Sequence, residues 1–395
     1  PSTGTAFVAP LWGAAGVALL AALVILLPRR RRDGHVPAPV DAATEDPGPS
    51  VARRTSANLS TTIAAGEAQA FGRYTVLARI GEGGMCEIFT AALTGPEGFQ
   101  RVVVLKRLKP GIARLRAAVD QFIDEAKLGS TLVHSNIVPV LDFGKVGDGY
   151  FIAQEYVVGR DVGQIVDRHA ERLDEPLDTA VVVYIVHEIL QALAYAHDKT
   201  DDAGAPLHVV HRDVSPGNVL VSRDGEVKLI DFGIVKAEGR VSQTDTGNVK
   251  GNAAYMAPEQ ARGLVVDRRA DLFSLGLVMF RALSREPFYK GGSTAEVFYG
   301  AASGPTDEHF ARIDLLPAPI RPLLRQALAP DPAARFSTAE EFATALAPQL
   351  QPGAKTALAT LMHALFGSEL RTPGASGAGG TNAAVAARAH GDRGR

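Results

Sequence analysis

The chain has 395 residues, of which 46% are hydrophobic, enough for one large domain or for two lobes with appended segments. Its 41 basic and 43 acidic residues give a net charge of −2, so the composition gives no reason to expect nucleic acid as a partner. Cys86 is the only cysteine, which excludes an intrachain disulfide framework and a cysteine zinc site.

An apolar segment near the N-terminus is the first predicted element. Residues 11–27 carry no charge, and the apolar stretch extends back to Ala6. About 20 helical residues cross the ~30 Å hydrocarbon layer of a membrane. Four arginines follow at 29–32, and arginines beside a span stay in the cytoplasm. We expect one transmembrane helix over residues 6–28 in the cell inner membrane, with the rest of the chain cytoplasmic.

A secretory signal peptide is the alternative for this segment. It would need positive charge before the apolar run and small residues at a cleavage site after it. Here the arginines come after the run, so a membrane anchor is favoured.

Two further segments are rich in proline, glycine and small residues, namely residues 29–72 and 372–395. Such sequences bury too little apolar surface to offset the entropy lost on ordering. We expect a disordered juxtamembrane linker in the first and a disordered tail in the second.

A glycine-rich turn follows the strand-like residues 74–80. Glycines between two strands let the backbone fold closely over phosphates, where a side chain would collide. The run Gly81-Glu82-Gly83-Gly84 meets this need. Taken alone it predicts only a hairpin.

A lysine ends the next strand-like run, residues 102–106. A lysine in this position is costly to bury unless it is paired. Glu125, on the helix-like stretch 119–128, is the candidate partner of Lys106. Each residue taken separately would be explained as a solvated surface charge.

The strongest pattern is His211-Arg212-Asp213 with Asn218 five positions on, followed by Asp231-Phe232-Gly233. With residue frequencies of roughly 5%, the first four residues alone match by chance on the order of 10⁻⁵ times per start position. Between them, an Asp-Gly turn at 224–225 predicts a hairpin. That hairpin would bring Asn218 and Asp231 to one end, where both reach the same metal ion.

The order of these motifs, ending with Ala257-Pro258-Glu259, resembles the signature of the protein kinases. The chain looks like a bacterial member of the eukaryotic-type serine/threonine kinases over about residues 74–348. The resemblance implies an α+β, bilobal fold over residues 73–350. A small β-rich N-lobe would cover about 73–157 and a larger helical C-lobe about 158–350.

The resemblance also implies ATP and Mg²⁺ as cofactors and assigns roles to residues. Lys106 would hold the α- and β-phosphates and be held by Glu125. Asp213 would accept the proton of the substrate hydroxyl, while Asn218 and Asp231 would bind Mg²⁺.

The resemblance places a further set of residues around the nucleotide, although packing or surface exposure would explain the adenine and ribose positions equally well. The set is Ile80, Gly81, Glu82, Gly83, Gly84, Ile88, Val104, Lys106, Glu155, Val157, Asp161 and Leu220.

Other positions resemble supports of the kinase core. Asp271 would brace the backbone of the catalytic loop, and Arg335 would pair with Glu259. Arg212 would bind a phosphate on the activation loop, for which Thr244 and Thr246 are the preferred acceptors.

Three positions depart from the family pattern. Cys86 replaces the third loop glycine, Ser215 replaces a lysine that contacts the transferred group, and Asn252 replaces a threonine. Two alternatives to an active enzyme therefore stay open, a pseudokinase scaffold and a membrane sensor module. Either would bind nucleotide or partners without useful catalysis. Cys86 also suggests a redox switch, although a small residue that simply fits there is the favoured interpretation.

Beyond the core, apolar residues recur at helical spacing within residues 351–371. An accessory helix docked on the second lobe is favoured over a helix that binds a partner. The expected partners are protein substrates, the membrane and a second copy of the chain for autophosphorylation.

Overall fold

The computed structural model describes residues 61–62, 69–232 and 253–373. All of them belong to one compact unit, Ser56–Arg395. The second unit, Pro1–Thr55, lies outside the described residues, as does the predicted transmembrane helix.

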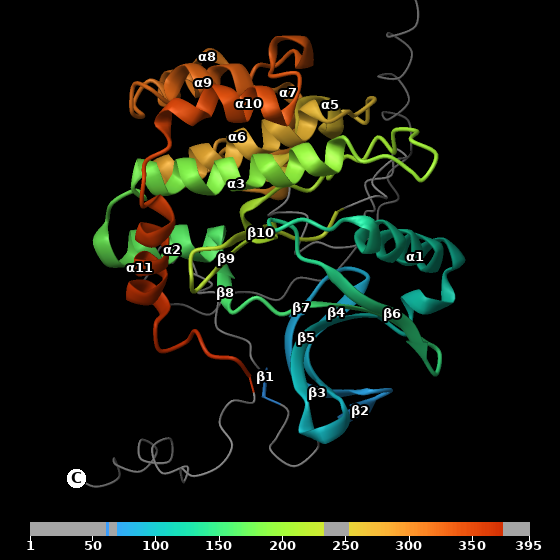
Figure 1. The fold of residues 1–395 in the computed structure, drawn as a ribbon. Coiled ribbons are helices and arrows are strands. Elements are labelled where there is room, and N and C mark those ends of the chain that lie inside the picture. Colours follow the sequence, from blue (N-terminus) through green and yellow to red (C-terminus); the bar gives the residue numbers. More distant parts are fainter. Residues whose placement is uncertain (1–60, 63–68, 233–252, 374–395) are drawn as a thin grey trace, which may run out of the picture. The chain divides into compact units, whose positions relative to one another are not determined.

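The first part of the described chain forms a seven-stranded antiparallel sheet in the order β1-β3-β4-β5-β7-β6, with β2 paired to β3. We call this sheet with helix α1 (Arg116–Thr131) the sheet lobe (Figure 1). Its strands are β1 (Thr61–Thr62), β2 (Gln69–Phe71), β3 (Tyr74–Glu82), β4 (Cys86–Thr94), β5 (Gln100–Leu108), β6 (Val140–Val146) and β7 (Gly149–Glu155).

Strand β5 shows how the sheet lobe presents its lysine. Side chains alternate between the two faces of a strand. Val103 and Leu105 are buried in the apolar cluster on one face, so Val104 and Lys106 point to the other face. The β-branched run of β5 therefore directs Lys106 toward the helical part of the chain.

The predicted linker over residues 29–72 needs a correction at its C-terminal end. β1 and β2, both inside that range, pair with β3. Their backbone groups extend the edge of an existing sheet, so they need little apolar surface of their own. Amino-acid composition does not reveal backbone pairing of this kind.

The remaining residues form the helical lobe, which carries a second, three-stranded sheet in the order β10-β9-β8. Its strands are β8 (Gly159–Asp161), β9 (Val219–Ser222) and β10 (Val227–Leu229). Its helices are α2 (Val162–Leu173), α3 (Thr179–His197), α5 (Pro258–Ala261), α6 (Arg269–Ser284), α7 (Thr294–Ser303), α8 (Asp307–Ile313), α9 (Arg321–Ala327), α10 (Ala339–Leu346) and α11 (Ala354–Phe366). The short 3₁₀ helices of the sheet lobe are η1 (Pro96–Gly98) and η2 (Ile112–Arg114). Those of the helical lobe are η3 (Pro216–Asn218), η4 (Ala253–Tyr255), η5 (Pro332–Ala334) and η6 (Ala347–Gln349).

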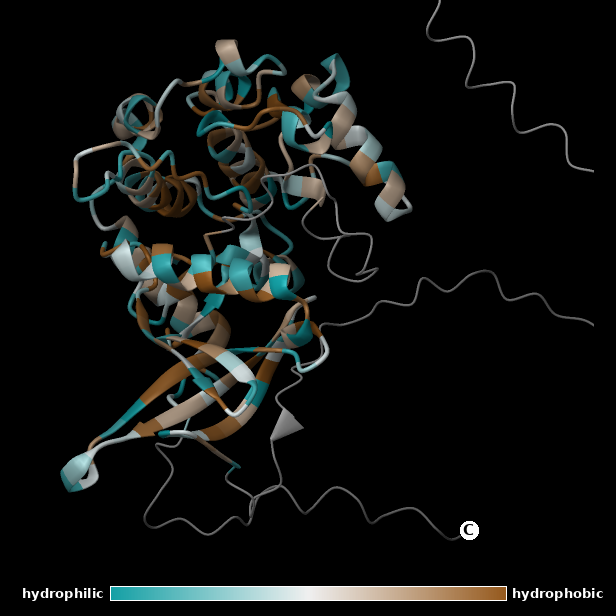
Figure 2. Ribbon diagram, turned by 90° about the vertical axis from the view of Figure 1, so that its right-hand side faces the viewer, coloured by the Kyte–Doolittle hydropathy of each residue, from teal (hydrophilic) through white to brown (hydrophobic). Residues whose placement is uncertain are grey.

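Helices α3 and α6 run side by side through the helical lobe and supply much of its core (Figure 1). Hydrophobic residues are concentrated in its inner helices and on the strands of the sheets (Figure 2). Within the described residues, α3 alone is long and apolar enough to cross a membrane. Much of α3 is buried in the core, which accounts for its apolar composition.

The predicted hairpin is formed by β9 and β10, with Val219 opposite Leu229. The turn requires a glycine because Gly225 has a φ of +78°. The Ser222 hydroxyl accepts hydrogen bonds from the backbone of Asp224 and Glu226 and so closes the turn.

The C-terminal helix α11 lies within the predicted accessory segment 351–371. Its apolar side chains are buried against the helical lobe, including Leu358 and Met362. Thr372 and Pro373 are the only described residues of the predicted tail.

Candidate functional site

Lys106 lies between two carboxylates that come from distant parts of the chain. Its Nζ donates to Glu125 of α1 at 2.7 Å and to Asp231, just after β10, at 2.9 Å. Burial opposes the charge of Lys106, but the two carboxylates outweigh it and raise the pKa of the ammonium above its usual value. Lys106 is therefore a fixed cation that joins the sheet lobe to the helical lobe.

Asp271 of α6 holds the backbone of the loop over residues 211–218, which the sequence predicts to be catalytic. Its carboxylate accepts from the backbone N–H of His211 and of Arg212, each at 2.8 Å, and from Nε2 of His197 at 2.8 Å. Burial alone would raise the pKa of Asp271, but the His197 hydrogen bond and the other donors hold it below its usual value. The loop thus rests on a buried, charged anchor.

The same loop is tied to the strand that leads to Asp231. Nε2 of His211 lies 2.8 Å from the carbonyl oxygen of Ile230, and its ring packs on Phe232 at 4.6 Å. Arg212 and Asp231 both have a φ above +60°. Non-glycine residues hold such angles only where the surroundings fix them, often at functional sites.

Asn218 connects Asp213 to the predicted metal site. Its Nδ2 donates to the backbone oxygen of Asp213 at 2.7 Å and to the Asp213 carboxylate at 3.2 Å. With the amide nitrogen used in this way, the amide oxygen is left to bind a ligand. The carbonyl oxygen of Asn218 also accepts from the N–H of Ile230, which places Asn218 beside Asp231.

These residues fit Mg²⁺ bound together with phosphates. Over the described parts of the chain, no group of three or more His, Cys, Asp or Glu residues is placed to hold a metal. Magnesium typically uses one or two carboxylates plus substrate phosphates. Asp231 and the amide oxygen of Asn218 supply that smaller set.

The glycine-rich turn joins β3 to β4, and the N–H of Gly83 donates to the carbonyl oxygen of Cys86 at 2.8 Å. The side chain of Glu82 is paired with Lys109 at 2.8 Å and with Arg79. Only its backbone is therefore available to cover phosphates.

Cys86 packs in an apolar cluster with Leu108 and Phe122. Burial raises the pKa of its thiol to about 12. The thiolate is the reactive form, so this environment argues against the redox switch. It agrees with the other interpretation, in which Cys86 is simply a small residue that fits the space.

The residues predicted around adenine and ribose come from several strands. Val104 pairs with Gln154 next to the end of β7, and Leu220 pairs with Asp161 across β8 and β9. Ile88 lies opposite Lys106, while Ile80 is 42% exposed.

Two of the predicted nucleotide contacts have partners of their own. The side chain of Glu155 accepts from Lys228 at 3.2 Å, and only its backbone is left for adenine. Asp161 is the N-cap of α2 and accepts from the N–H of Gln164 at 2.9 Å. Burial raises the pKa of Asp161 to about 6. Val157 follows β7 and is partly buried.

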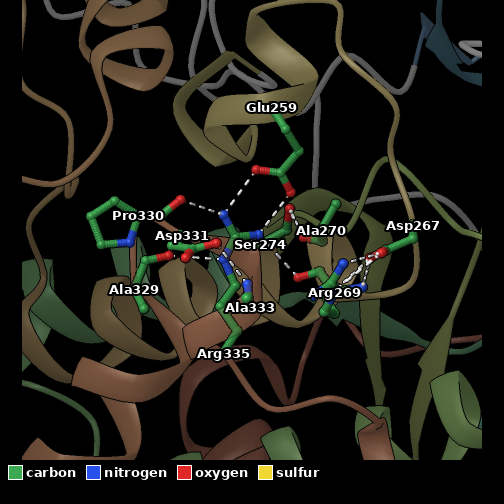
Figure 3. Close-up of polar contacts among 10 residues, drawn as sticks. All are labelled: Glu259, Asp267, Arg269, Ala270, Ser274, Ala329, Pro330, Asp331, Ala333 and Arg335. Carbon is green, nitrogen blue, oxygen red and sulfur yellow. Dashed lines mark hydrogen bonds and ion pairs between the residues drawn. The ribbon is translucent and has the colours of Figure 1, made fainter. Parts of the chain in front are cut away.

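Arg335 and Glu259 form a two-pronged ion pair at 2.7 and 2.8 Å (Figure 3). Both residues are buried. Arg335 also donates to the carbonyl oxygens of Ala329 and Pro330. The pair fixes α5, whose Gln260 in turn donates to the backbone oxygen of Arg212 at 2.7 Å.

The guanidinium of Arg212 has a buried Nε with no hydrogen-bond acceptor in the part of the chain that the structure describes. Its predicted phosphate partners, Thr244 and Thr246, lie outside the described residues. The same holds for Gly233 and Asn252, whereas Ser215 is buried at the start of η3.

Sequence patterns did not single out two residues that position the site. His197 supports Asp271, and Asn136 joins α3 to β10 by donating to Glu188 and to the carbonyl oxygen of Val227. His197 is the last residue of the long apolar helix α3. A polar residue at the end of such a helix was the one feature of the sequence that could have pointed to it.

Comparisons with known proteins agree with this geometry. The protein kinase domain family matches residues 74–346. Over 282 residues the chain is 42% identical to the tyrosine-protein kinase MasK of Myxococcus xanthus, covering 70% of this chain and 43% of that protein. It is 38% identical to the serine/threonine-protein kinase pkn3 of Myxococcus xanthus, covering 68% and 48%.

A third relative is the serine/threonine-protein kinase PrkC of Bacillus subtilis, with 31% identity over 69% of this chain and 39% of that protein. The chain thus spans less than half the length of these curated relatives. Among solved structures, the kinase domain of Mycobacterium tuberculosis PknI matches with a TM-score of 0.53 and 30% identity. That match covers 73% of this chain and all of the PknI domain.

Proposed function

The chain belongs to the protein kinase domain family, and from that premise we propose that it transfers the γ-phosphoryl group of ATP to serine and threonine hydroxyls of proteins, including its own. One observation carries the proposal. Lys106 and Asp231 are joined at 2.9 Å, and Asn218 donates to Asp213 beside them. The N–H of Ile230 donates to the carbonyl oxygen of Asn218, so the four residues that the reaction needs come together from three separate stretches of the chain.

Each residue has a task that follows from its surroundings. Phosphoryl transfer requires little covalent chemistry from the protein, so catalysis comes from positioning and from neutralising charge. Lys106, held by Glu125, presents a fixed cation to phosphate oxygens. Asp213, on a backbone anchored by Asp271, accepts the proton of the attacking hydroxyl.

Protein kinases in general use ATP and Mg²⁺, and we propose the same for this chain. When bound, Mg²⁺ neutralises the developing charge on the phosphate oxygens. Asp231 and the amide oxygen of Asn218 are the residues that would hold it.

A pseudokinase is the less favoured alternative. Ser215 in place of a lysine removes one positioned charge, and such donors are worth up to roughly 10²–10³ in rate. Against this, Lys106, Asp213, Asn218 and Asp231 are all present, and hydrogen bonds join Lys106 to Asp231 and Asn218 to Asp213. The expected result is a slower enzyme and not an inactive scaffold.

The relatives differ in the acceptor that their names state, because MasK is named a tyrosine kinase and pkn3 and PrkC are named serine/threonine kinases. We propose serine and threonine as the acceptors. Pro216 after Ser215, and Tyr255 before Met-Ala-Pro-Glu, resemble the serine/threonine branch of the family and not the tyrosine branch. Identification of the phosphorylated amino acid distinguishes the two possibilities.

The location and regulation are also proposals. Residues 6–28 would anchor the chain in the cell inner membrane with the kinase domain in the cytoplasm. A second copy of the chain would phosphorylate Thr244 or Thr246, and the buried Nε of Arg212 would face that phosphate. Mass spectrometry of the active protein that finds no phosphate on this loop would remove the regulatory part.

The deciding experiment measures transfer of labelled phosphate from ATP with Mg²⁺ to the protein itself and to a generic basic protein. Lys106→Met is the control because it removes the cation that joins Glu125 and Asp231. We expect label on serine or threonine in the wild type and none in the control. Label that persists in the control would indicate a contaminant, and its absence from both would favour the scaffold.

A further inference from the structure

The segment 354–370, which we call the C-terminal clamp, is built into the helical lobe. It consists of α11 and the four residues after it, and it packs against α2 and α3 (Figure 1). The side chains that it buries are Ala354, Leu358, Met362, Leu365, Phe366 and Leu370. Burial of these six apolar side chains anchors the clamp to the helical lobe.

Glu369 joins the clamp to two elements at once. One carboxylate oxygen accepts from Arg168 of α2 at 2.8 Å, and the other accepts from Arg160 of β8 at 3.1 Å. The hydrogen bond from Arg168, followed by that from Arg160, lowers the pKa of Glu369. Both guanidinium groups also lie over the ring of Phe366, at 4.7 and 5.4 Å.

Arginines of α2 also complete the end of α11. Arg172 donates to the carbonyl oxygen of Ala364 at 2.8 Å, and Arg168 reaches that of Leu365 at 3.4 Å. The last carbonyl groups of a helix have no partner within the helix. Cations at this end also interact favourably with the helix dipole. The clamp and α2 therefore stabilise each other's position.

The clamp meets the β9–β10 hairpin as well. A Cβ atom added at Gly225 would lie 2.5 Å from the carbonyl oxygen of Lys355 in α11. This hairpin carries Asn218 before its first strand and Asp231 after its second. The clamp thus touches the support of both proposed metal ligands.

Arg160 connects the clamp to the strand beside the predicted ribose and adenine positions. It stands in β8 directly before Asp161, and Asp161 pairs with Leu220 of β9. The two strands are very close, because a Cβ at Gly159 would fall 1.9 Å from the carbonyl oxygen of Val221. Arg160 therefore belongs to the same small sheet as Asp161 and Leu220, the predicted ribose and adenine positions.

We propose that Glu369 is a positioning residue for ATP binding, which acts by fixing Arg160 against α2. This inference rests on the proposed function in one respect, that ATP is the nucleotide bound between Leu220 and the sheet lobe. The clamp lies outside the residues matched by the kinase family, which end at 346. The proposal gives the segment after the kinase core an indirect role in nucleotide binding.

The test compares Glu369→Gln with the wild-type chain. The amide keeps the size of the side chain and removes its charge, so the two arginines lose their shared anion. Because partly exposed ion pairs are worth a fraction of a kilocalorie to about one, we expect the Kd and KM for ATP to rise about threefold. The kcat at saturating ATP should stay within about twofold of wild type, and Glu369→Asp should restore part of the affinity.

Glu286→Gln is the matched control. Glu286 also bridges two cations, Lys290 at 2.7 Å and Arg312 of α8 at 3.1 Å, and neither of these comes from the clamp, α2 or β8. It should leave both the Kd and the KM for ATP unchanged. A Glu369→Gln variant that binds ATP as Glu286→Gln does would overturn the proposal and leave the clamp with a purely structural role.

Binding of ATP with Mg²⁺, measured by calorimetry on the full chain, separates this proposal from the proposed function. A wild-type chain that binds ATP and transfers no phosphate would defeat the kinase proposal, while the loss of affinity in Glu369→Gln would still support the clamp. A wild-type chain that binds no ATP would overturn both.

Discussion

The carboxylate of Asp161 has two roles, one observed and one predicted. It caps α2 by accepting from the N–H of Gln164, and it stands where the ribose of a nucleotide is expected. Burial raises its pKa from 3.8 to about 6. The carboxyl group of Asp161 therefore holds its proton more tightly in the folded protein than in the unfolded chain.

The raised pKa of Asp161 predicts a pH dependence of stability. Since the folded state binds the extra proton, the free energy of unfolding falls as pH rises through the window from about 4 to 6, by on the order of 1–3 kcal/mol. Asp161→Asn retains a good N-cap and removes the titration. The variant should gain stability relative to wild type between pH 4.5 and 7.5, as measured by thermal melts at both values.

Asp224→Asn is the control for this prediction, because Asp224 is exposed in the hairpin turn. Its melting temperature should follow that of the wild type at both pH values. An Asp161→Asn variant whose difference from wild type is the same at pH 4.5 and 7.5 would contradict the assignment.

Arg335 illustrates the cost of removing one partner of a buried ion pair. Arg335→Ala leaves Glu259 as an uncompensated buried charge, and such losses cost roughly 3–5 kcal/mol. Thermal or urea unfolding should show this loss as a clear destabilisation. Arg325→Ala provides the matched comparison, since Arg325 makes two contacts of 2.7 Å to Asp314 in an exposed pair.

The exposed pair should be worth about 0–1 kcal/mol. If the two arginine variants melted at the same temperature, the Arg335–Glu259 pair would not be the support that we describe.

At the scale of elements, the hairpin turn and α11 interact through Gly225. Both Gly225 and Gly204 have a left-handed φ, +78° and +83°. A side chain at Gly204 would meet nothing within 4 Å, whereas at Gly225 it would meet the backbone of Lys355. The two positions share the conformational strain and differ in the contact.

This difference makes a paired prediction. Gly204→Ala should destabilise by about 1–2 kcal/mol through left-handed strain alone. Gly225→Ala should cost about 1–3 kcal/mol more, because α11 or the turn must move. Chemical denaturation of both variants measures the difference. Equal losses would show that α11 does not press on the hairpin.

At the scale of the whole molecule, the sequence predicted the core of the candidate site and some of its supports. The Lys106–Glu125 pair, the Asp271 brace and the Arg335–Glu259 pair followed from motifs whose residue types and order resemble those of the protein kinases. No pattern links His197 to Asp271, or Glu369 to Arg160, since an ion pair between distant residues leaves no periodic signal. The pairing of β1 and β2 with β3 was missed because it depends on backbone groups alone.

The proposed nucleotide site draws on both lobes, since Lys106 lies in the sheet lobe and Asp231 in the helical lobe. A ligand that binds only the folded state stabilises it by about 2.7 kcal/mol at 100 times its Kd. ATP with Mg²⁺ should therefore raise the melting temperature by several degrees.

Asp231→Asn tests which residue carries the metal-dependent part of this shift. The asparagine keeps an oxygen near Lys106 and removes the charge that Mg²⁺ requires. We expect ATP with a chelator to stabilise the variant about as much as the wild type, whereas added Mg²⁺ should stabilise the wild type further and the variant little. Melts of both proteins with ATP, with and without the chelator, measure this. An equal response of the two proteins to Mg²⁺ would contradict the role of Asp231 as a metal ligand.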